Sequence, residues 1–313
     1  MQSALSSFSA TSGPSALSLP PPVFPVAGGA KARPRIALVL GSGGVRSVAA
    51  IGIVDRLARE GIRPDVIVGC SSGALFGATI ACGMAPDEAL DAATSLWTAE
   101  LTRQKRWRSL LQLLAPRLAG FDADFALRDN RLIAERLRSA FGSLRFDQLP
   151  TPLRVVATAA ATGQRVVLEE GSVVDALLAS MAVPFLFPSV KIGNLRLVDG
   201  VVSDPLPVAV AHDAQVVISL GFFGAVPRRP RNAGRMAAQA ATSLINNLMQ
   251  ARLDAARANG QRIVPLHLRV RGRVGIWETA AMPTLCEAGR AAAEACLPEL
   301  WDALQGAQPR LVA

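Results

Sequence analysis

Several residue types that often reveal a protein's function are scarce in this sequence. Four cysteines occur in 313 residues, with no metal-ligand spacing and too few for a disulfide framework, so we expect reduced thiols, a cytoplasmic location and no metal or other cofactor. No uninterrupted apolar run reaches about 18 residues, so no transmembrane helix is predicted. Histidine occurs twice, at His212 and His267, which leaves few candidates for a histidine base.

Lysine is also scarce, at Lys31, Lys105 and Lys191, so the net charge of +9 comes almost wholly from arginine. A basic excess favours anionic partners such as lipid head groups, and arginine suits bidentate contacts with phosphate or carboxylate. We favour dispersed, solvated arginines and expect no nucleic-acid partner. Segment 102–117 combines clustered cations with a leucine run; an ordinary surface helix is the favoured interpretation, and a helix lying on an anionic membrane surface is the alternative.

The first 34 residues differ in composition from the rest of the chain. Segment 1–34 is rich in Ser, Ala and Pro, lacks acidic residues and has little periodic apolar surface to bury, so it is predicted to be a disordered tail. It has neither the basic start and apolar run of a secretory signal nor the scattered arginines of a transit peptide. We find no linker and no internal repeat further on, so residues 35–313 are predicted to form one domain.

After the tail, short apolar runs alternate with helical patterns. An apolar run at 35–40 leads through a glycine cluster to a helical pattern at 45–60, and an apolar run at 65–69 leads to a helical pattern at 73–82. Two consecutive strand–loop–helix units favour a parallel sheet covered by helices. The other expected elements are mostly helix over 87–140, strands at 153–158, 165–168, 195–198, 215–220 and 263–270, and helices at 235–259 and 284–304.

The second unit carries a Gly-x-Ser-x-Gly pentapeptide at its strand-to-helix turn. Gly69 and Gly73 omit side chains that would collide in a sharp turn, so Ser71 would project from the carboxyl edge of the sheet. The following helix aims N–H groups and its positive end at the same place, where an oxyanion would develop. This setting predicts a nucleophilic serine, and Cys70 is predicted to point away from it into the packing.

A nucleophilic serine needs a base, because its protonated hydroxyl is a weak nucleophile. His267 could complete a triad in the α/β-hydrolase order, but it falls inside the predicted strand 263–270, whereas triad histidines usually lie on loops. Asp199 follows an apolar run and precedes Gly200, so its carboxylate would stand at a strand end, where α/β sites form. An Asp-Gly turn without a catalytic role is the alternative for Asp199.

Four sequence blocks follow one another in a defined order. They are the glycine-rich block 41–46, the pentapeptide 69–73, a Ser-x-Ala-x-Pro segment within 179–190, and Asp199-Gly200. Together these blocks resemble the patatin-like phospholipase family of serine acyl hydrolases, and the resemblance extends over residues 35–220. It implies an α/β fold with a single patatin-like domain, in which a mostly parallel central sheet is flanked by helices on both faces.

The resemblance also implies a chemistry without histidine. Ser71 would attack the acyl ester of a phospholipid or lysophospholipid, and Asp199 would accept its proton and later activate water. For an aspartate to act near neutral pH, its surroundings must raise its pKa by about three units, which corresponds to about 4 kcal/mol. The resemblance names no cofactor, and it leaves the head group, the acyl chain and the oligomeric state open.

The same resemblance assigns roles to the glycine-rich loop that contains Gly41. Backbone N–H groups of Gly43 and Gly44 would form the oxyanion hole, and Arg46 would organise the loop. The sequence departs from the family pattern at Ser42 and at position 47, where family members often have glycine, and at position 201, where a small residue is usual. These departures affect the predicted substrate detail more than the predicted activity.

Two other functions are compatible with parts of this sequence. Gly41-x-Gly43 after a strand could form a phosphate cradle for a nucleotide, but Arg46 replaces the third glycine and no Gly-Lys-Ser/Thr follows. A membrane-associated module that kept the fold and lost turnover is the second alternative. Ester hydrolysis with Ser71→Ala as the control would distinguish both from an enzyme.

Overall fold

The structure is a computed structural model and describes residues 33–102, 109, 112, 125–225, 230, 232–270, 272 and 274–307. The chain divides by its internal contacts into Met1–Arg33 and Pro34–Ala313, and the elements below belong to the second unit. The predicted disordered tail 1–34 and the basic segment 102–117 lie almost wholly outside the described residues.

An eight-stranded mixed sheet forms the centre of this unit, in the order β5-β6-β3-β2-β1-β7-β8 with β4 paired to β3. Strands β3, β2, β1, β7 and β8 are parallel, whereas β4, β5 and β6 are joined by antiparallel pairing. The strands are β1 (Ile36–Leu40), β2 (Val66–Cys70), β3 (Leu153–Ala159), β4 (Arg165–Leu168), β5 (Val190–Ile192), β6 (Leu195–Asp199), β7 (Val216–Leu220) and β8 (Arg262–Leu266).

The helices match most of the expected helical patterns. A 3-10 turn (Gly44–Val48) leads into α1 (Ala49–Arg59), and the other described α-helices are α2 (Ser72–Ala81), α3 (Pro86–Leu96), α6 (Arg131–Phe141), α7 (Val173–Ser180), α8 (Ala233–Ala258) and α9 (Met282–Gly306). Helix α7 and strand β5 were not predicted. Of the long helical stretch expected over 87–140, the described residues contain α3, a short 3-10 turn and most of α6.

The last strand is shorter than predicted, and this corrects the position of His267. Strand β8 ends at Leu266, opposite Leu220 at the end of β7. Because β7 also ends there, the backbone beyond Leu266 has no neighbouring strand with which to continue the hydrogen-bond ladder. His267 therefore lies after the edge strand and not within it.

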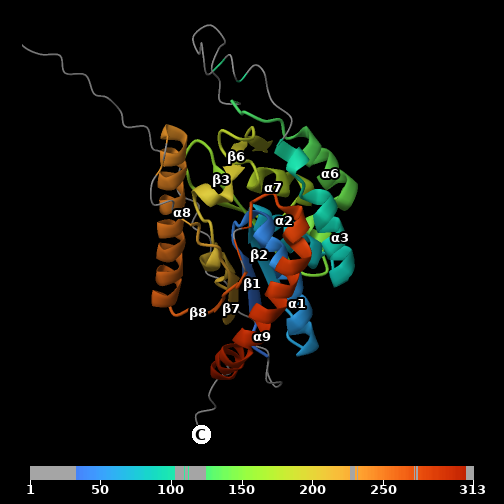
Figure 1. Ribbon diagram of the computed structural model, residues 1–313. Helices are drawn as coiled ribbons and strands as arrows, with labels where there is room; N and C mark the ends of the chain where they lie inside the picture. Colours follow the sequence, from blue (N-terminus) through green and yellow to red (C-terminus); the bar gives the residue numbers. More distant parts are fainter. Residues whose placement is uncertain are drawn as a thin grey trace, which may run out of the picture. The chain divides into compact units, whose positions relative to one another are not determined.

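The two faces of the sheet are covered by different helices. Along β1, Ile36, Leu38 and Leu40 pack with α1, α2, α3, α6, α7 and α9, whereas Ala37 and Val39 pack with α8. Alternate residues of a strand point to opposite faces, so a strand covered on both sides needs an unbroken apolar run. Figure 1 shows α8 on one side of the strands and α1, α2, α3, α6 and α9 on the other. The predicted fold class is confirmed.

The pairing register along β3 brings two strand ends together. Cys70, the last residue of β2, pairs with Val156, and Asp199, the last residue of β6, pairs with the next position, Ala157. Ser71 follows Cys70 directly. Its side chain and the carboxylate of Asp199 therefore meet at one point of the sheet, although 128 positions separate them in the chain.

Candidate active site

The turn after β2 holds Ser71 in a strained backbone conformation. Ser71 has φ 55° and ψ −126°, a positive φ that residues other than glycine rarely adopt. The turn is closely packed, because a Cβ at Gly73 would lie 2.3 Å from the carbonyl oxygen of Leu40, and one at Gly69 would lie 2.4 Å from the Cα of Ala74. The two glycines therefore permit the sharp turn that presents the Ser71 hydroxyl in front of α2.

The hydroxyl of Ser71 donates a hydrogen bond to the carboxylate of Asp199, with 2.7 Å between Oγ and Oδ2. The other carboxylate oxygen, Oδ1, accepts from the backbone N–H of Val201 at 2.8 Å. Asp199 is completely buried. Within the described residues no lysine or arginine forms an ion pair with it, so its charge is balanced by hydrogen bonds alone.

Burial raises the pKa of Asp199 from its ordinary value of 3.8 to about 7. Loss of hydration is the largest cause, and the hydrogen bonds from Val201 and Ser71 oppose it by stabilising the charged form. A carboxylate with this pKa exchanges its proton near neutral pH, which is the property required of a general base working at that pH. The surroundings of Asp199 therefore shift its pKa in the direction that a base at neutral pH would require.

Ser180, the last residue of α7, supports the turn from the other side. Its Oγ accepts a hydrogen bond from the backbone N–H of Ser71 at 2.8 Å and donates a hydrogen bond to the carbonyl oxygen of Val156 at 2.6 Å. The bond fixes the turn to β3, next to the position where Asp199 pairs. Ser180 was not predicted as a site residue, although it opens the Ser-x-Ala-x-Pro segment that the sequence had singled out.

The glycine-rich loop after β1 lies beside Ser71, and its backbone donors are mostly occupied. The N–H groups of Gly41, Ser42 and Val45 donate to the carbonyls of Leu220, Pro205 and Ile276, and the N–H of Gly43 donates to Ser72 Oγ at 3.2 Å. The Gly44 N–H makes no hydrogen bond to any described residue. One of the two predicted oxyanion donors is therefore available in this structure, and the other is held by a neighbouring hydroxyl.

This pattern of occupied donors also bears on the nucleotide-binding alternative. A phosphate cradle needs several free backbone N–H groups that converge on one anion. In the described structure the loop has one, at Gly44. The loop therefore lacks the donor set that a phosphate cradle requires.

Two buried hydroxyls brace this loop from below. Ser47 Oγ lies 3.0 Å from Ser72 Oγ and donates to the carbonyl of Gly41 at 3.3 Å. Each hydroxyl has one proton, so Ser72 donates to Ser47 while it accepts from Gly43. The serine at position 47, where the family often has glycine, thus completes a hydrogen-bonded chain that fixes the loop.

Arg46 lies against the same loop. Its Nε donates to the carbonyl of Gly43 at 3.1 Å, and its guanidinium lies 4.9 Å from the ring centroid of Phe222. Burial lowers the pKa of Arg46 from its usual value, although the group stays charged at neutral pH. The guanidinium is therefore a partly buried positive charge that lines the cavity next to Phe222 and has no effect on the pKa of Asp199.

A cavity of about 370 Å³ opens at the dyad, within the range of about 300–1,000 Å³ that is typical of ligand sites. Ser71, Asp199 and Arg46 are among its polar lining residues, together with Ser42, Thr242 and Asn246, and most of the remaining lining is apolar. Side chains of α2, α3, α6 and the segment after α7 form much of this apolar wall, including Leu75, Leu96, Leu137, Met181, Leu186 and Phe187. The cavity can hold an apolar chain whose polar end lies at Ser71.

The sequence candidates His212, His267, Cys70 and Gly200 do not line the cavity. His212 and His267 are both exposed. Cys70 is buried, and burial raises the pKa of its thiol well above 9, so it is not a ready nucleophile. Gly200 packs beneath the dyad, because a Cβ there would lie 2.3 Å from the carbonyl oxygen of Val156. All four cysteines are free thiols.

Comparison with known proteins identifies the family. A family model described as patatin-like phospholipase matches residues 38–212, which is more than half of the chain. The chain belongs to the patatin-like phospholipase family, as the resemblance of its four sequence blocks predicted. Among the described residues, no helix has the length and apolarity needed to cross a membrane.

Individual relatives share part of their length with this chain. An uncharacterized NTE family protein of Mycobacterium bovis is 34% identical over 200 residues, which cover 63% of this chain and 52% of that protein. The neuropathy target esterase sws of Drosophila melanogaster is 28% identical over 181 residues, which cover 57% of this chain and 12% of that protein. The chain therefore spans about half the length of the mycobacterial relative and a smaller share of the fly protein.

Two solved structures overlap with most of the chain at low sequence identity. VipD from Legionella pneumophila has a TM-score of 0.44 and 14% identity, covering 84% of this chain and 67% of its own. The type III effector protein ExoU has a TM-score of 0.40 and 18% identity, covering 88% of this chain and 54% of its own.

Proposed function

We propose that this protein is a serine acyl hydrolase that cleaves acyl esters of phospholipids or lysophospholipids, with Ser71 as the nucleophile and Asp199 as the base. The observation that carries the proposal is the 2.7 Å hydrogen bond from Ser71 Oγ to a fully buried carboxylate with no cationic partner among the described residues. The family and the apolar cavity support a lipid ester as the substrate class.

In the proposed first step, Ser71 Oγ attacks the carbonyl carbon of the ester while its proton passes to Asp199 Oδ2. The negative charge that develops on the carbonyl oxygen is stabilised by the N–H of Gly44 and by the positive end of α2. When the tetrahedral intermediate collapses, the C–O bond to the alcohol breaks and the alcohol takes the proton from Asp199. The acyl group stays on Ser71, and its chain occupies the apolar cavity.

In the proposed second step, Asp199 takes a proton from water, and the hydroxide attacks the acyl-enzyme. Collapse of this second intermediate returns the proton to Ser71 Oγ and releases the fatty acid. Both steps need Asp199 unprotonated at the start and protonated midway, which suits a pKa of about 7. A histidine base is not part of this mechanism.

The proposed substrate resides in a membrane, so the proposal includes peripheral contact with a lipid surface. Val202, Phe223 and Ile276 expose 47%, 50% and 60% of their surface. Ile276 lines the cavity, and the other two directly follow lining residues. Apolar side chains in such positions can enter a bilayer surface beside the cavity. Binding of the protein to phosphatidylglycerol vesicles should fall several-fold in Phe223→Ser, and unchanged binding would refute this contact.

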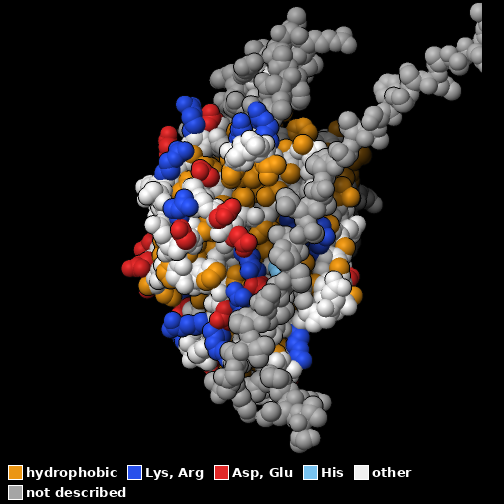
Figure 2. All heavy atoms as spheres, turned by 180° about the vertical axis from the view of Figure 1, so that it is seen from behind, with side chains coloured by type: hydrophobic (Ala, Val, Ile, Leu, Met, Phe, Trp, Pro, Cys, Tyr) orange, Lys and Arg blue, Asp and Glu red, His pale blue; other side chains and the backbone are white. Residues whose placement is uncertain are grey.

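The distribution of charged side chains gives the proposed membrane contact weaker support than the exposed apolar side chains do. Figure 2 shows Lys and Arg side chains interspersed with Asp and Glu on the face that it displays, where no single sign dominates. This mixture fits the expected dispersed arginines, and no nucleic-acid partner is proposed. A cytoplasmic location remains part of the proposal, supported by four free thiols.

The test of the proposed activity is a fluorophosphonate probe combined with a panel of lipid esters. We expect covalent labelling of Ser71 in the wild-type protein, and a loss of ester hydrolysis in Ser71→Ala of at least about 10³-fold. Cys70→Ala is the matched control, because it changes the neighbouring residue and should retain labelling. A wild-type protein that is folded but neither reacts with the probe nor hydrolyses any ester would overturn the proposal.

A further inference from the structure

Two tryptophans from distant parts of the chain form one side of the cavity. Trp97 follows α3, and Trp277 lies in the turn before α9; their rings are stacked, with centroids 4.6 Å apart and planes inclined by 16°. Both rings line the cavity. We call this pair the tryptophan wall. No sequence motif marks either residue.

The tryptophan wall is fixed by hydrogen bonds as well as by stacking. The carbonyl oxygen of Ile276 accepts from the indole N–H of Trp97 at 2.9 Å and from the backbone N–H of Val45 at 3.0 Å. Val45 follows Gly44, which lines the cavity with Ser71 and whose N–H has no partner among the residues that the structure describes. The Ile276 carbonyl thus connects the tryptophan wall to the glycine-rich loop. The distance between the wall and this loop is therefore set by backbone contacts.

The two rings differ in how deeply they are buried. Trp97 is 6% exposed and packs at its back against the buried Phe76, with 6.1 Å between ring centroids. Trp277 is half-buried and lies nearer to solvent. The inner ring is therefore part of the core, whereas the outer ring can be removed without opening the core.

We infer that the tryptophan wall limits the length of acyl chain that the cavity accepts. The inference rests on the hydrolase function proposed above and goes beyond it, because it names the residues that set chain preference. The two rings are stacked, and the Trp97 ring is also hydrogen-bonded, so they are less free to move aside than a flexible leucine or methionine. Methylene groups that fit the cavity favour binding by about fourfold each, and those that meet the wall gain nothing.

The test compares hydrolysis of nitrophenyl esters of increasing acyl length by the full chain and three variants. In Trp277→Ala the ratio of kcat/KM for long esters to kcat/KM for short ones should rise by about 15-fold, corresponding to about two further methylenes. Trp97→Phe replaces the indole by a smaller aromatic ring, so it should raise the same ratio by a smaller factor. Trp301→Ala is the matched control, because Trp301 lies on α9, is 40% exposed and does not line the cavity.

A chain-length profile of Trp277→Ala that parallels the wild-type profile would overturn the inference. So would an equal shift in Trp301→Ala, because that would indicate a general loss of packing. Labelling rates with fluorophosphonates of short and long alkyl chains give the same comparison without turnover. Failure of the wild type to react with any probe or ester refutes the proposed hydrolase; a reactive wild type with unchanged chain preference in both wall variants refutes the wall alone.

Discussion

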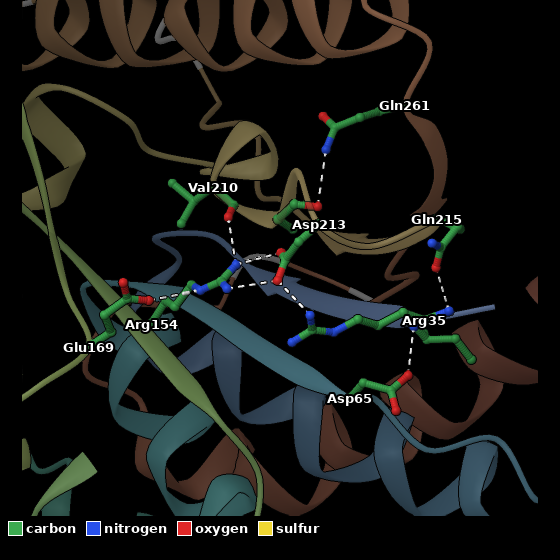
Figure 3. Close-up of polar contacts among 10 residues, drawn as sticks. Arg35, Asp65, Arg154, Glu169, Val210, Asp213, Gln215 and Gln261 are labelled. Atoms are coloured by element: carbon green, nitrogen blue, oxygen red, sulfur yellow. Dashed lines mark hydrogen bonds and ion pairs between the residues drawn. The ribbon is translucent and has the colours of Figure 1, made fainter. Parts of the chain in front are cut away.

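Asp199 and Asp213 lie at opposite ends of the parallel strands, and arginines surround only the second. The carboxylate of Asp213 accepts hydrogen bonds from the two terminal guanidinium nitrogens of Arg154, at 2.6 and 2.8 Å. It also forms an ion pair with Arg35 at 2.8 Å. Figure 3 shows this cluster, in which Glu169 also contacts Arg154. Asp199, at the carboxyl ends, has hydrogen bonds from a hydroxyl and an N–H instead.

The pKa values of the two carboxyl groups move in opposite directions. The hydrogen bond from Arg154 is the main reason that the pKa of Asp213 lies below its ordinary value, whereas burial raises the pKa of Asp199 to about 7. An aspartate fastened by arginine is a poor proton acceptor, because the cation stabilises its charged form. The two aspartates therefore differ in their partners: burial without a paired cation raises the pKa of Asp199, whereas paired arginines lower the pKa of Asp213.

The largest effect expected from this comparison is on turnover. Asp199→Asn should lower kcat for ester hydrolysis by at least about 10³-fold, since an amide cannot accept the proton of Ser71. Asp213→Asn should leave kcat within about twofold, because it acts far from the cavity. Rates per folded molecule, with folding checked by circular dichroism, test both. Comparable losses in the two variants would show that the ends of the sheet do not differ in this way.

The second expected effect is on stability, and it depends on pH. The folded protein holds the Asp199 proton up to a pH of about 7, whereas the unfolded chain releases it near 4, so wild-type stability falls as pH rises between these values. The amide of Asp199→Asn does not ionise, so the stability of this variant does not fall with pH for this reason. Its free energy of unfolding should exceed that of the wild type by about 4 kcal/mol at pH 8 and by little at pH 4. Urea unfolding at both pH values measures the difference, and a variant that is less stable at pH 8 would contradict a raised pKa.

A smaller change of opposite sign is expected at the other end of the sheet. The lowered pKa of Asp213 contributes stability that is present above a pH of about 4 and is lost as pH falls through its folded value. Asp213→Asn leaves Arg154 with Glu169 as its one described carboxylate partner and removes the ion pair of Arg35, so it should destabilise the protein at pH 7 by about 1–3 kcal/mol. The same urea experiments should show this deficit shrinking in acid; a deficit that is constant with pH would have another cause.

The smallest effect concerns the outer arginine of the cluster. The Arg35 side chain is 40% exposed, so solvent screens its bond to Asp213, and Arg35→Gln should change the free energy of unfolding by at most about 0.5 kcal/mol. High salt should remove this small difference. A loss as large as that of Asp213→Asn would mean that Arg35, and not Arg154, holds the carboxylate.

Much of the fold could be read from the sequence, because its strands are buried on both faces. Such strands need unbroken apolar runs, and the predicted runs 35–40 and 65–69 therefore marked β1 and β2 to within a residue. Helix α7 and the short strand β5 escaped prediction, since their apolar content has no periodicity that separates them from the neighbouring loops. His267 was wrongly placed in a strand because an apolar pattern does not reveal where the neighbouring strand ends.

Some residues of the candidate site could be found from the local sequence, whereas others are recognised only from their contacts in the folded protein. The sequence alone determined the turn around Ser71, because glycines at 69 and 73 leave few other conformations open at a strand-to-helix junction. It also selected Asp199, through the resemblance to a family that comparison confirmed. Ser180, Trp97 and Trp277 were missed, since their contacts lie across the fold and leave no mark in local spacing.

Tertiary structure alone decided the protonation behaviour and the shape of the site. Register along β3 set the 2.7 Å bond between Ser71 and Asp199, and burial without a cation raised the carboxyl pKa to about 7. Packing also determined that the Gly43 N–H is bonded to Ser72, whereas the Gly44 N–H makes no hydrogen bond within the described part of the chain. Local sequence fixes which backbone turns can form, whereas pKa, donor availability and cavity shape depend on neighbours that folding brings together from distant parts of the chain.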